Sequence, residues 1–148
     1  MEEIESVIGE IGIHPVAKAE IELNSVIARS PGMKYKHYAP KAEVILVEGK
    51  DISSVAKKIQ EIHDELVSEG KKVGLMVTGE CYVSGHILRR MGPRDDLVRI
   101  AQNIFKILKE FDQDRVDVII AEGVSTRGLG LAIMNRLRRA SGGNIIKL

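Results

Sequence analysis

Short apolar runs alternate with helical apolar stripes from residue 43 to the end of the chain. Three runs are apolar at successive positions, as is typical of strands buried on both faces: EVILVE at 43–48, KVGLMVTG at 72–79 and VDVIIAEG at 116–123. Helices are predicted from the apolar stripes of 52–66, 97–111 and 129–140. NIIKL at 144–148 is a candidate for a last short strand.

This alternation predicts a Rossmann-like, three-layer α/β domain with a mainly parallel sheet of about 4–5 strands. Residues 81–83 are a candidate for a further short strand within the irregular segment CYVSGHILRRMGP. Pro93 is expected in the first turn of the helix that follows, because proline is tolerated there. Gly142 and Gly143 are expected to end the last helix.

The first 42 residues lack this regular pattern. Ile4, Val7 and Ile8 form a short helical stripe that ends at Gly9, and no sustained period follows. The segment SPGMKYKHYAPK at 30–41 contains two prolines and a glycine, which predict an extended loop rather than a helix or a core strand. Its tyrosines and lysines could contact a phosphate or a carboxylate, although a solvated linker has the same composition.

Composition narrows the classes of protein and site. The formal net charge of +1 gives no general attraction to nucleic acid or to an acidic membrane. Cys81 is the single cysteine, so no intrachain disulfide can form, and a reducing cytoplasm is expected. The N-terminus is acidic, and no apolar run has the length of a membrane span, which favours an intracellular protein. The four histidines are far apart in the sequence, so no metal site is predicted.

Ligands of Rossmann-like domains bind outside the carboxyl ends of the strands. Two loops are expected at this edge, residues 78–79 and residues 122–130. In the second loop a serine or threonine could cap the last helix, and glycines could leave backbone amides open to an anion. The residues of this possible ligand or anion site are Gly79, Ser125, Thr126, Gly128, Gly130, Asn135 and Arg136.

Structural roles compete with ligand binding at these positions. The glycines could instead allow close packing of helix and strand, and Ile133 stands where a dinucleotide fingerprint needs its third glycine. Arg136 falls in the apolar stripe of the last helix and needs a partner, which could be Glu122, a backbone carbonyl or a ligand. The exposed arginines of this region lack interleaved aromatic residues, which favours a solvated surface over an RNA-binding face; they are Arg127, Arg138 and Arg139.

Two segments together carry a resemblance to a known family. SPGMKYKHYAPKAEVILVEG at 30–49 and LKEFDQDRVDVIIAEGVSTRGLGLAIMNRLRRAS at 108–141 resemble the C-terminal half of long-form threonylcarbamoyl-AMP synthases, the SUA-type relatives of the YrdC family. The resemblance extends over residues 1 to about 141. It implies that residues 1–12 are a remnant of the YrdC-like catalytic domain, 13–42 an interdomain linker and 43–148 a Rossmann-like accessory domain.

In that family the catalytic domain joins threonine, bicarbonate and ATP into threonylcarbamoyl-adenylate, which serves the threonylcarbamoyladenosine modification of tRNA. The resemblance implies a regulatory or gating domain, with ATP and magnesium needed by the parent enzyme and no cofactor in this chain. No catalytic residue is expected here, and the chain alone is expected to be inactive. Residues expected to face the cleft of the catalytic domain are Pro31, Gly32, Met33, Lys34, Tyr35, His37 and Tyr38.

Two other functions stay open at this point. The domain could be a nucleotide-binding Rossmann-like module, or it could bind tRNA as an accessory domain. The expected partner is the YrdC-like catalytic domain, with a nucleotide as a further candidate and tRNA as a weaker one; no membrane partner is expected.

Overall fold

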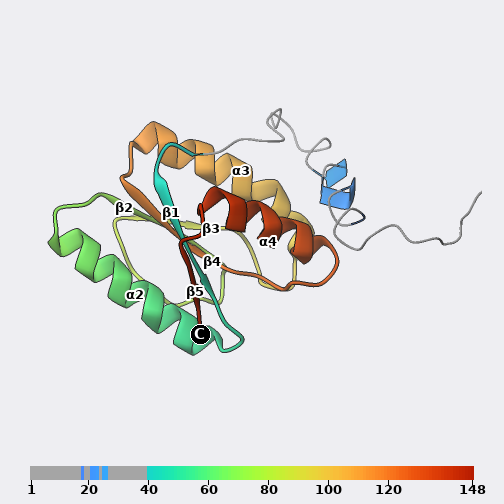
Figure 1. Ribbon diagram of the computed structural model, residues 1–148, viewed down its shortest axis with the longest axis horizontal. Helices are drawn as coiled ribbons and strands as arrows, with labels where there is room; N and C mark the ends of the chain where they lie inside the picture. The colour runs from blue at the N-terminus through green and yellow to red at the C-terminus, as the bar shows by residue number, and fades with distance from the viewer. Residues whose placement is uncertain (1–17, 19–20, 24, 27–39) are drawn as a thin grey trace, which may run out of the picture.

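A five-stranded sheet, entirely parallel, forms the centre of the domain (Figure 1). The computed structural model describes residues 18, 21–23, 25–26 and 40–148. The strands are β1 (Glu43–Glu48), β2 (Val73–Val77), β3 (Ile87–Arg90), β4 (Val118–Glu122) and β5 (Ile145–Lys147), in the spatial order β3-β2-β4-β1-β5. The sheet confirms the predicted Rossmann-like class and the short last strand.

Helices cover both faces of the sheet. Helix α2 (Ile52–Ser68) lies on one face, and α3 (Leu97–Asp114) and α4 (Leu129–Ala140) lie on the other (Figure 1). Each face has its own apolar cluster, because the central strands β2 and β4 are buried on both sides. The stripes predicted for the three helices face these clusters, as expected for helices that cover a parallel sheet.

Two details of the segment between β2 and α3 differ from the prediction. The strand is at Ile87–Arg90 and not at residues 81–83, because β3 runs parallel to β2 and the chain must first return along the sheet. Helix α3 begins at Leu97 and not at Pro93, because Asp96 caps it: its Oδ1 accepts a hydrogen bond from the Arg99 amide at 3.1 Å.

The crossovers from two neighbouring strands leave in opposite directions. Strands β1 and β4 are paired side by side, yet β1 leads into α2 on one face and β4 leads into α4 on the other. A crevice between two such loops is the topological switch point of an open α/β sheet, where ligands of this architecture bind. The fold therefore places the β1–α2 and β4–α4 loops on either side of one crevice.

Part of the segment before the domain is attached to it. Residues 21–23 and 25–26 are helical, and Leu23 and Val26 are buried in the cluster on the α3 and α4 side. At the end of the SPGMKYKHYAPK segment, the amide of its last residue, Lys41, donates to Oδ1 of Asp112 at 3.0 Å. The seven residues expected to face a catalytic cleft, Pro31 to Tyr38, lie outside the described residues, as does the expected remnant at 1–12.

Candidate functional site

A cavity of about 740 Å³ opens at the carboxyl edge of the sheet, at the switch point between β1 and β4. Its walls come from the ends of β1 and β5, from the start of α2, from the β4–α4 loop and from the loop before α3. The polar and charged lining residues are Glu48, Lys50, Asp51, Ser54, Arg94, Ser125, Thr126, Arg127 and Lys147. Val124, Met134 and Leu148 supply apolar surface.

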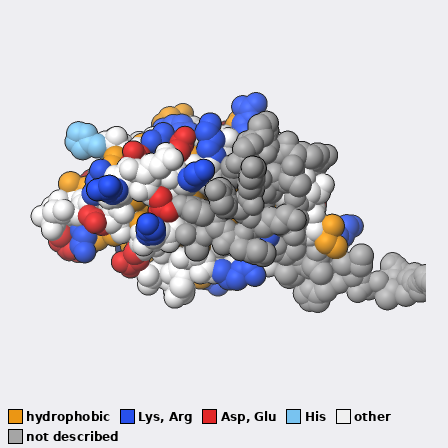
Figure 2. Space-filling view, turned by 90° about the horizontal axis from the view of Figure 1, so that it is seen from above, with side chains coloured by type: hydrophobic (Ala, Val, Ile, Leu, Met, Phe, Trp, Pro, Cys, Tyr) orange, Lys and Arg blue, Asp and Glu red, His pale blue; other side chains and the backbone are white. Residues whose placement is uncertain are grey.

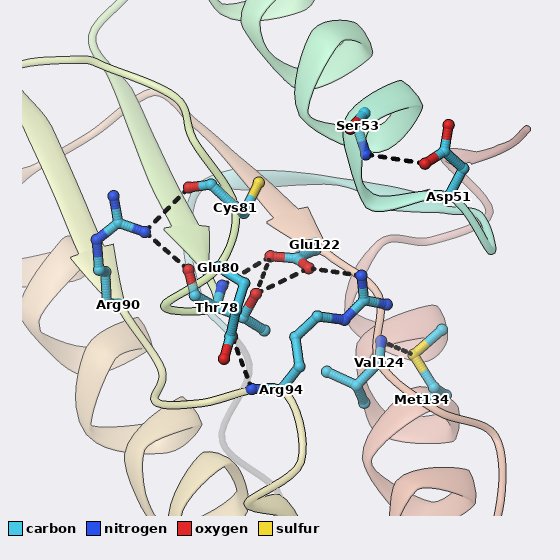
Figure 3. A network of polar contacts seen from close by, with 10 residues as sticks. All are labelled: Asp51, Ser53, Thr78, Glu80, Cys81, Arg90, Arg94, Glu122, Val124 and Met134. Atoms are coloured by element: carbon cyan, nitrogen blue, oxygen red, sulfur yellow. Dashed lines mark hydrogen bonds and ion pairs between the residues drawn. The ribbon is translucent and has the colours of Figure 1, made fainter.

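A fully buried carboxylate lies beside this cavity. Glu122, the last residue of β4, is 0% exposed and accepts hydrogen bonds from the Thr78 amide at 2.7 Å and the Thr78 hydroxyl at 2.9 Å. Figure 3 shows Arg94 reaching from the loop before α3 toward Glu122, with its Nη1 3.7 Å from Oε2. A buried charge needs such partners, so Glu122 ties together β2, β4 and the loop that carries Arg94.

The loop after β2 is fixed by the same network. Arg90 donates to the carbonyl oxygens of Thr78 at 2.8 Å and Cys81 at 3.0 Å, and the Arg94 amide donates to Oε1 of Glu80 at 2.9 Å (Figure 3). Burial, with the nearby Glu122 carboxylate as a smaller cause, raises the pKa of the Cys81 thiol to about 12. Cys81 is therefore a protonated, packed side chain and not a nucleophile at neutral pH.

The acidic side chains of the cavity wall have partners of their own. Glu48 accepts two hydrogen bonds from Arg138 in α4, each at 2.9 Å, and these bonds hold the pKa of Glu48 below its ordinary value of 4.5. Asp51 caps α2, where Oδ1 accepts from the Ser53 amide at 3.3 Å and Oδ2 from the Ser54 hydroxyl at 2.7 Å.

The start of α4 differs from the expected anion cradle. Gly128, and not Ser125 or Thr126, is the N-cap residue, and it makes no side-chain capping bond. The Ser125 hydroxyl instead accepts from the Arg127 amide at 3.2 Å, and Gly128, at φ +54°, follows this turn directly before the helix. The Gly130 amide donates to the Arg127 carbonyl oxygen at 2.9 Å, so this donor is already used.

The possible site residues named from the sequence do not form one cluster. Ser125 and Thr126 line the cavity, and Gly128 and Gly130 lie at the adjoining start of α4. The Gly79 amide donates to the Gly92 carbonyl oxygen at 2.9 Å, away from the cavity wall. Asn135 and Arg136 lie further along α4, outside the cavity lining.

Of the three partners suggested for Arg136, Glu122 is engaged elsewhere. Glu122 pairs with Thr78 and Arg94, whereas the Arg136 guanidinium lies 5.9 Å from the centre of the Phe105 ring in α3. An aromatic face attracts a cation, so this contact is one partner for an arginine within an apolar stripe. Arg94 could not be predicted as a site residue, because it follows Pro93 in an irregular segment and no sequence pattern marks it.

The described residues on the face seen in Figure 2 do not form one continuous basic patch. Lys and Arg side chains are spread over the face seen there and alternate with Asp and Glu (Figure 2). Arg138, one of the three arginines suggested for RNA binding, forms an ion pair with Glu48. Among the described residues, no group of three or more His, Cys, Asp or Glu side chains could hold a metal ion. The described helices are all too short or too polar to cross a membrane.

Comparison with known proteins shows which family this chain matches. The model of the family described as "Threonylcarbamoyl-AMP synthase, C-terminal domain" matches residues 1–142. The threonylcarbamoyl-AMP synthase of Pyrococcus abyssi is 50% identical over 148 residues, which are all of this chain but 41% of that protein. This chain thus spans less than half the length of that relative.

Two solved structures of P. abyssi Sua5 are similar to this chain. The complex with L-threonine has a TM-score of 0.72 at 48% identity, over 99% of this chain and 41% of that one. A variant in which a histidine and the adjacent tyrosine are replaced by alanine has a TM-score of 0.70 at 46% identity, over 99% of this chain and 40% of that one. The chain therefore belongs to the family of the C-terminal domain of threonylcarbamoyl-AMP synthase.

Proposed function

We propose that this chain is the regulatory and gating domain of a threonylcarbamoyl-AMP synthase and acts on a YrdC-like catalytic domain. That domain would join threonine, bicarbonate and ATP, with Mg²⁺, and the product would serve the threonylcarbamoyladenosine modification of tRNA. The observation that carries the proposal is the family match over residues 1–142, which includes the segment before the domain as well as the domain itself. The ATP and magnesium sites would belong to the part of the relatives that this chain does not cover.

The segment SPGMKYKHYAPK is the proposed working part of the gate. Leu23 and Val26, which precede it, are buried against the domain, and the amide of its last residue, Lys41, donates to Asp112. A segment held at both ends by one domain would move with that domain. Such anchoring lowers the entropy cost of placing the segment over a partner's cleft.

His37 and Tyr38 are the best residues for testing the gate. They form the only adjacent His–Tyr pair in this sequence, and a variant with such a pair replaced by alanine is among the similar solved structures. Tyrosine offers an apolar face and a polar tip, and histidine can donate or accept a hydrogen bond, so both suit contact with an adenylate.

The test supplies a separately produced YrdC-like domain from the same source and follows formation and release of threonylcarbamoyl-AMP by mass spectrometry. This chain alone should form no product, and adding it to the catalytic domain should slow product release. Replacing both residues (His37→Ala with Tyr38→Ala) should abolish that retention while the circular dichroism spectrum and Tm stay unchanged.

A matched control is available within the described domain. Tyr82 is 87% exposed and His86 is also exposed, so replacing both with alanine removes the same two side-chain types from a different place. The control should retain product as the unmodified chain does. Equal retention by the chain and by its His37 and Tyr38 variant would contradict the gating proposal.

A further inference from the structure

We infer that the cavity between β1 and β4 binds a compact anion that carries two or more linked phosphate groups. The inference does not depend on the gating proposal, because it concerns residues of the domain alone. The cavity lies at the topological switch point of the sheet, and its volume of about 740 Å³ is within the range of small-molecule sites.

The charge of the lining favours an anion. Four basic side chains, Lys50, Arg94, Arg127 and Lys147, line the cavity together with two acidic ones. Both acidic side chains have partners within the domain: Glu48 accepts two hydrogen bonds from Arg138, and Asp51 caps the N-terminus of α2. The Arg138 pair offsets the charge of Glu48, whereas Asp51 keeps its charge because its partners are a neutral amide and a neutral hydroxyl. The basic side chains of the lining still outnumber the acidic ones by four to two.

The two basic side chains at the switch point are available. Lys50 lies in the β1–α2 loop and Arg127 in the β4–α4 loop, and both are exposed. Within the part of the chain that the structure describes, neither side chain forms an ion pair or a hydrogen bond. Because they come from the two loops that flank the crevice, they can approach one ligand from opposite sides.

Arg94 is held in place from behind. Its guanidinium contacts the buried Glu122 at 3.7 Å, and Arg94 is also part of the cavity lining. Glu122 is itself fixed by the amide and hydroxyl of Thr78. This arrangement presents a positioned cation to the cavity at little further entropy cost, which is the usual requirement for a strong anion site.

The rest of the lining distinguishes phosphate groups from a nucleobase. Ser54, Ser125 and Thr126 offer hydroxyl groups, which are suitable phosphate donors. Among the described residues, no aromatic side chain lines the cavity, so that part of the wall offers a base no stacking partner. The basic residues come from four separate segments of the chain, an arrangement that suits several charges on one ligand rather than a single phosphate.

Isothermal titration calorimetry of the full chain against sodium pyrophosphate, orthophosphate and ATP tests the inference. Pyrophosphate should bind once per chain and at least about tenfold more tightly than orthophosphate. Replacing Lys50 and Arg127 together (K50Q with R127Q) should weaken pyrophosphate binding at least about a hundredfold, since each removes a charge-assisted contact. Lys71→Gln is a control for the loss of a surface charge, because Lys71 is exposed and lies outside the cavity; pyrophosphate affinity should stay within about twofold.

The ATP arm separates two sources of the same phosphate chemistry. Equal affinities for ATP and pyrophosphate would show that the cavity recognises the phosphate chain alone, which supports the inference. A much tighter ATP complex would show that the nucleoside is recognised as well, which would overturn the inference of a compact phosphate ligand. Absence of pyrophosphate and ATP binding at millimolar concentrations would overturn it. Binding that K50Q with R127Q leaves unchanged would overturn it as well, whatever the outcome of the gating test.

Discussion

Replacing Gly130 with alanine separates a packing role of this glycine from a role in ligand binding. Gly130 is the second residue of α4 and lies against Ser125 in the preceding loop. A Cβ atom at position 130 would overlap the Ser125 carbonyl oxygen and lie 2.9 Å from its carbonyl carbon. Both atoms belong to the backbone, so no side-chain rotation can relieve the overlap and the loop itself must move.

The magnitude follows from two opposing effects. Carbon atoms in contact prefer a separation of ~3.5–4.0 Å, so the loop would have to retreat by at least about 0.6 Å. Overpacking costs about 1–3 kcal/mol, and a clash with backbone belongs at the upper end of that range. Alanine regains about 1 kcal/mol over glycine within a helix. The expected net loss of about 2 kcal/mol in unfolding free energy lowers Tm by about 4–8 °C for a chain of this size.

Urea and thermal unfolding followed by circular dichroism would measure this loss. Gly79→Ala is the matched control, because the nearest atom to a Cβ there, the Gly92 carbonyl oxygen, is 3.8 Å away. An unfolding free energy for G130A within about 0.5 kcal/mol of that control would refute the packing argument. Substitution of Gly130 is also a poor test of ligand binding, since movement of the loop would itself disturb the cavity.

Three further predictions concern other parts of the domain. Arg138 lowers the pKa of Glu48, so the stabilisation that the Glu48 carboxylate provides is complete above pH 4.5 and is lost as the pH falls through the lowered pKa. In urea unfolding from pH 7 to pH 3.5, the unfolding free energy of Glu48→Gln should therefore fall less than that of the unmodified chain. Asp96→Ala should cost about 1 kcal/mol by removing the cap of α3, whereas Asp96→Ser should retain most of it; equal urea midpoints for both would contradict this. The Cys81 thiol, buried with a pKa of about 12, should react with a thiol reagent at pH 8 only as fast as the domain unfolds, and rapid labelling of the folded chain would contradict its buried state.

The central strands could be predicted from the sequence because their burial is reflected in the apolar character of their own residues. β1, β2 and β4 are buried on both faces, and continuous apolar runs such as Val73–Val77 satisfy both faces at once. β3 is an edge strand with half-buried residues and the sequence ILRR, so no local run marks it. Its identity depends on pairing with β2, which is a tertiary contact.

Part of the cavity could be predicted from the class of the fold. Parallel strands bring their carboxyl ends to one edge, so the loop that carries Ser125 and Thr126 was correctly expected there. The spatial strand order could not be read from the sequence, and the β1–α2 loop with Lys50 was therefore not joined to the site. Only the observed order places β1 beside β4.

The buried charge at Glu122 links the fold to the proposed anion site. A carboxylate directly after the run VIIA on a central strand must be desolvated, and this cost demands donors from elsewhere in the chain. Thr78 at the end of β2 is one donor, because β2 is the other neighbour of β4 in the sheet. Arg94 is the second, and it is drawn to the cavity edge although its own segment has no regular structure. Glu122, whose burial is costly, thus fixes the position of the Arg94 guanidinium at the switch point. Arg94 can therefore both pair with Glu122 and contribute to the proposed anion site.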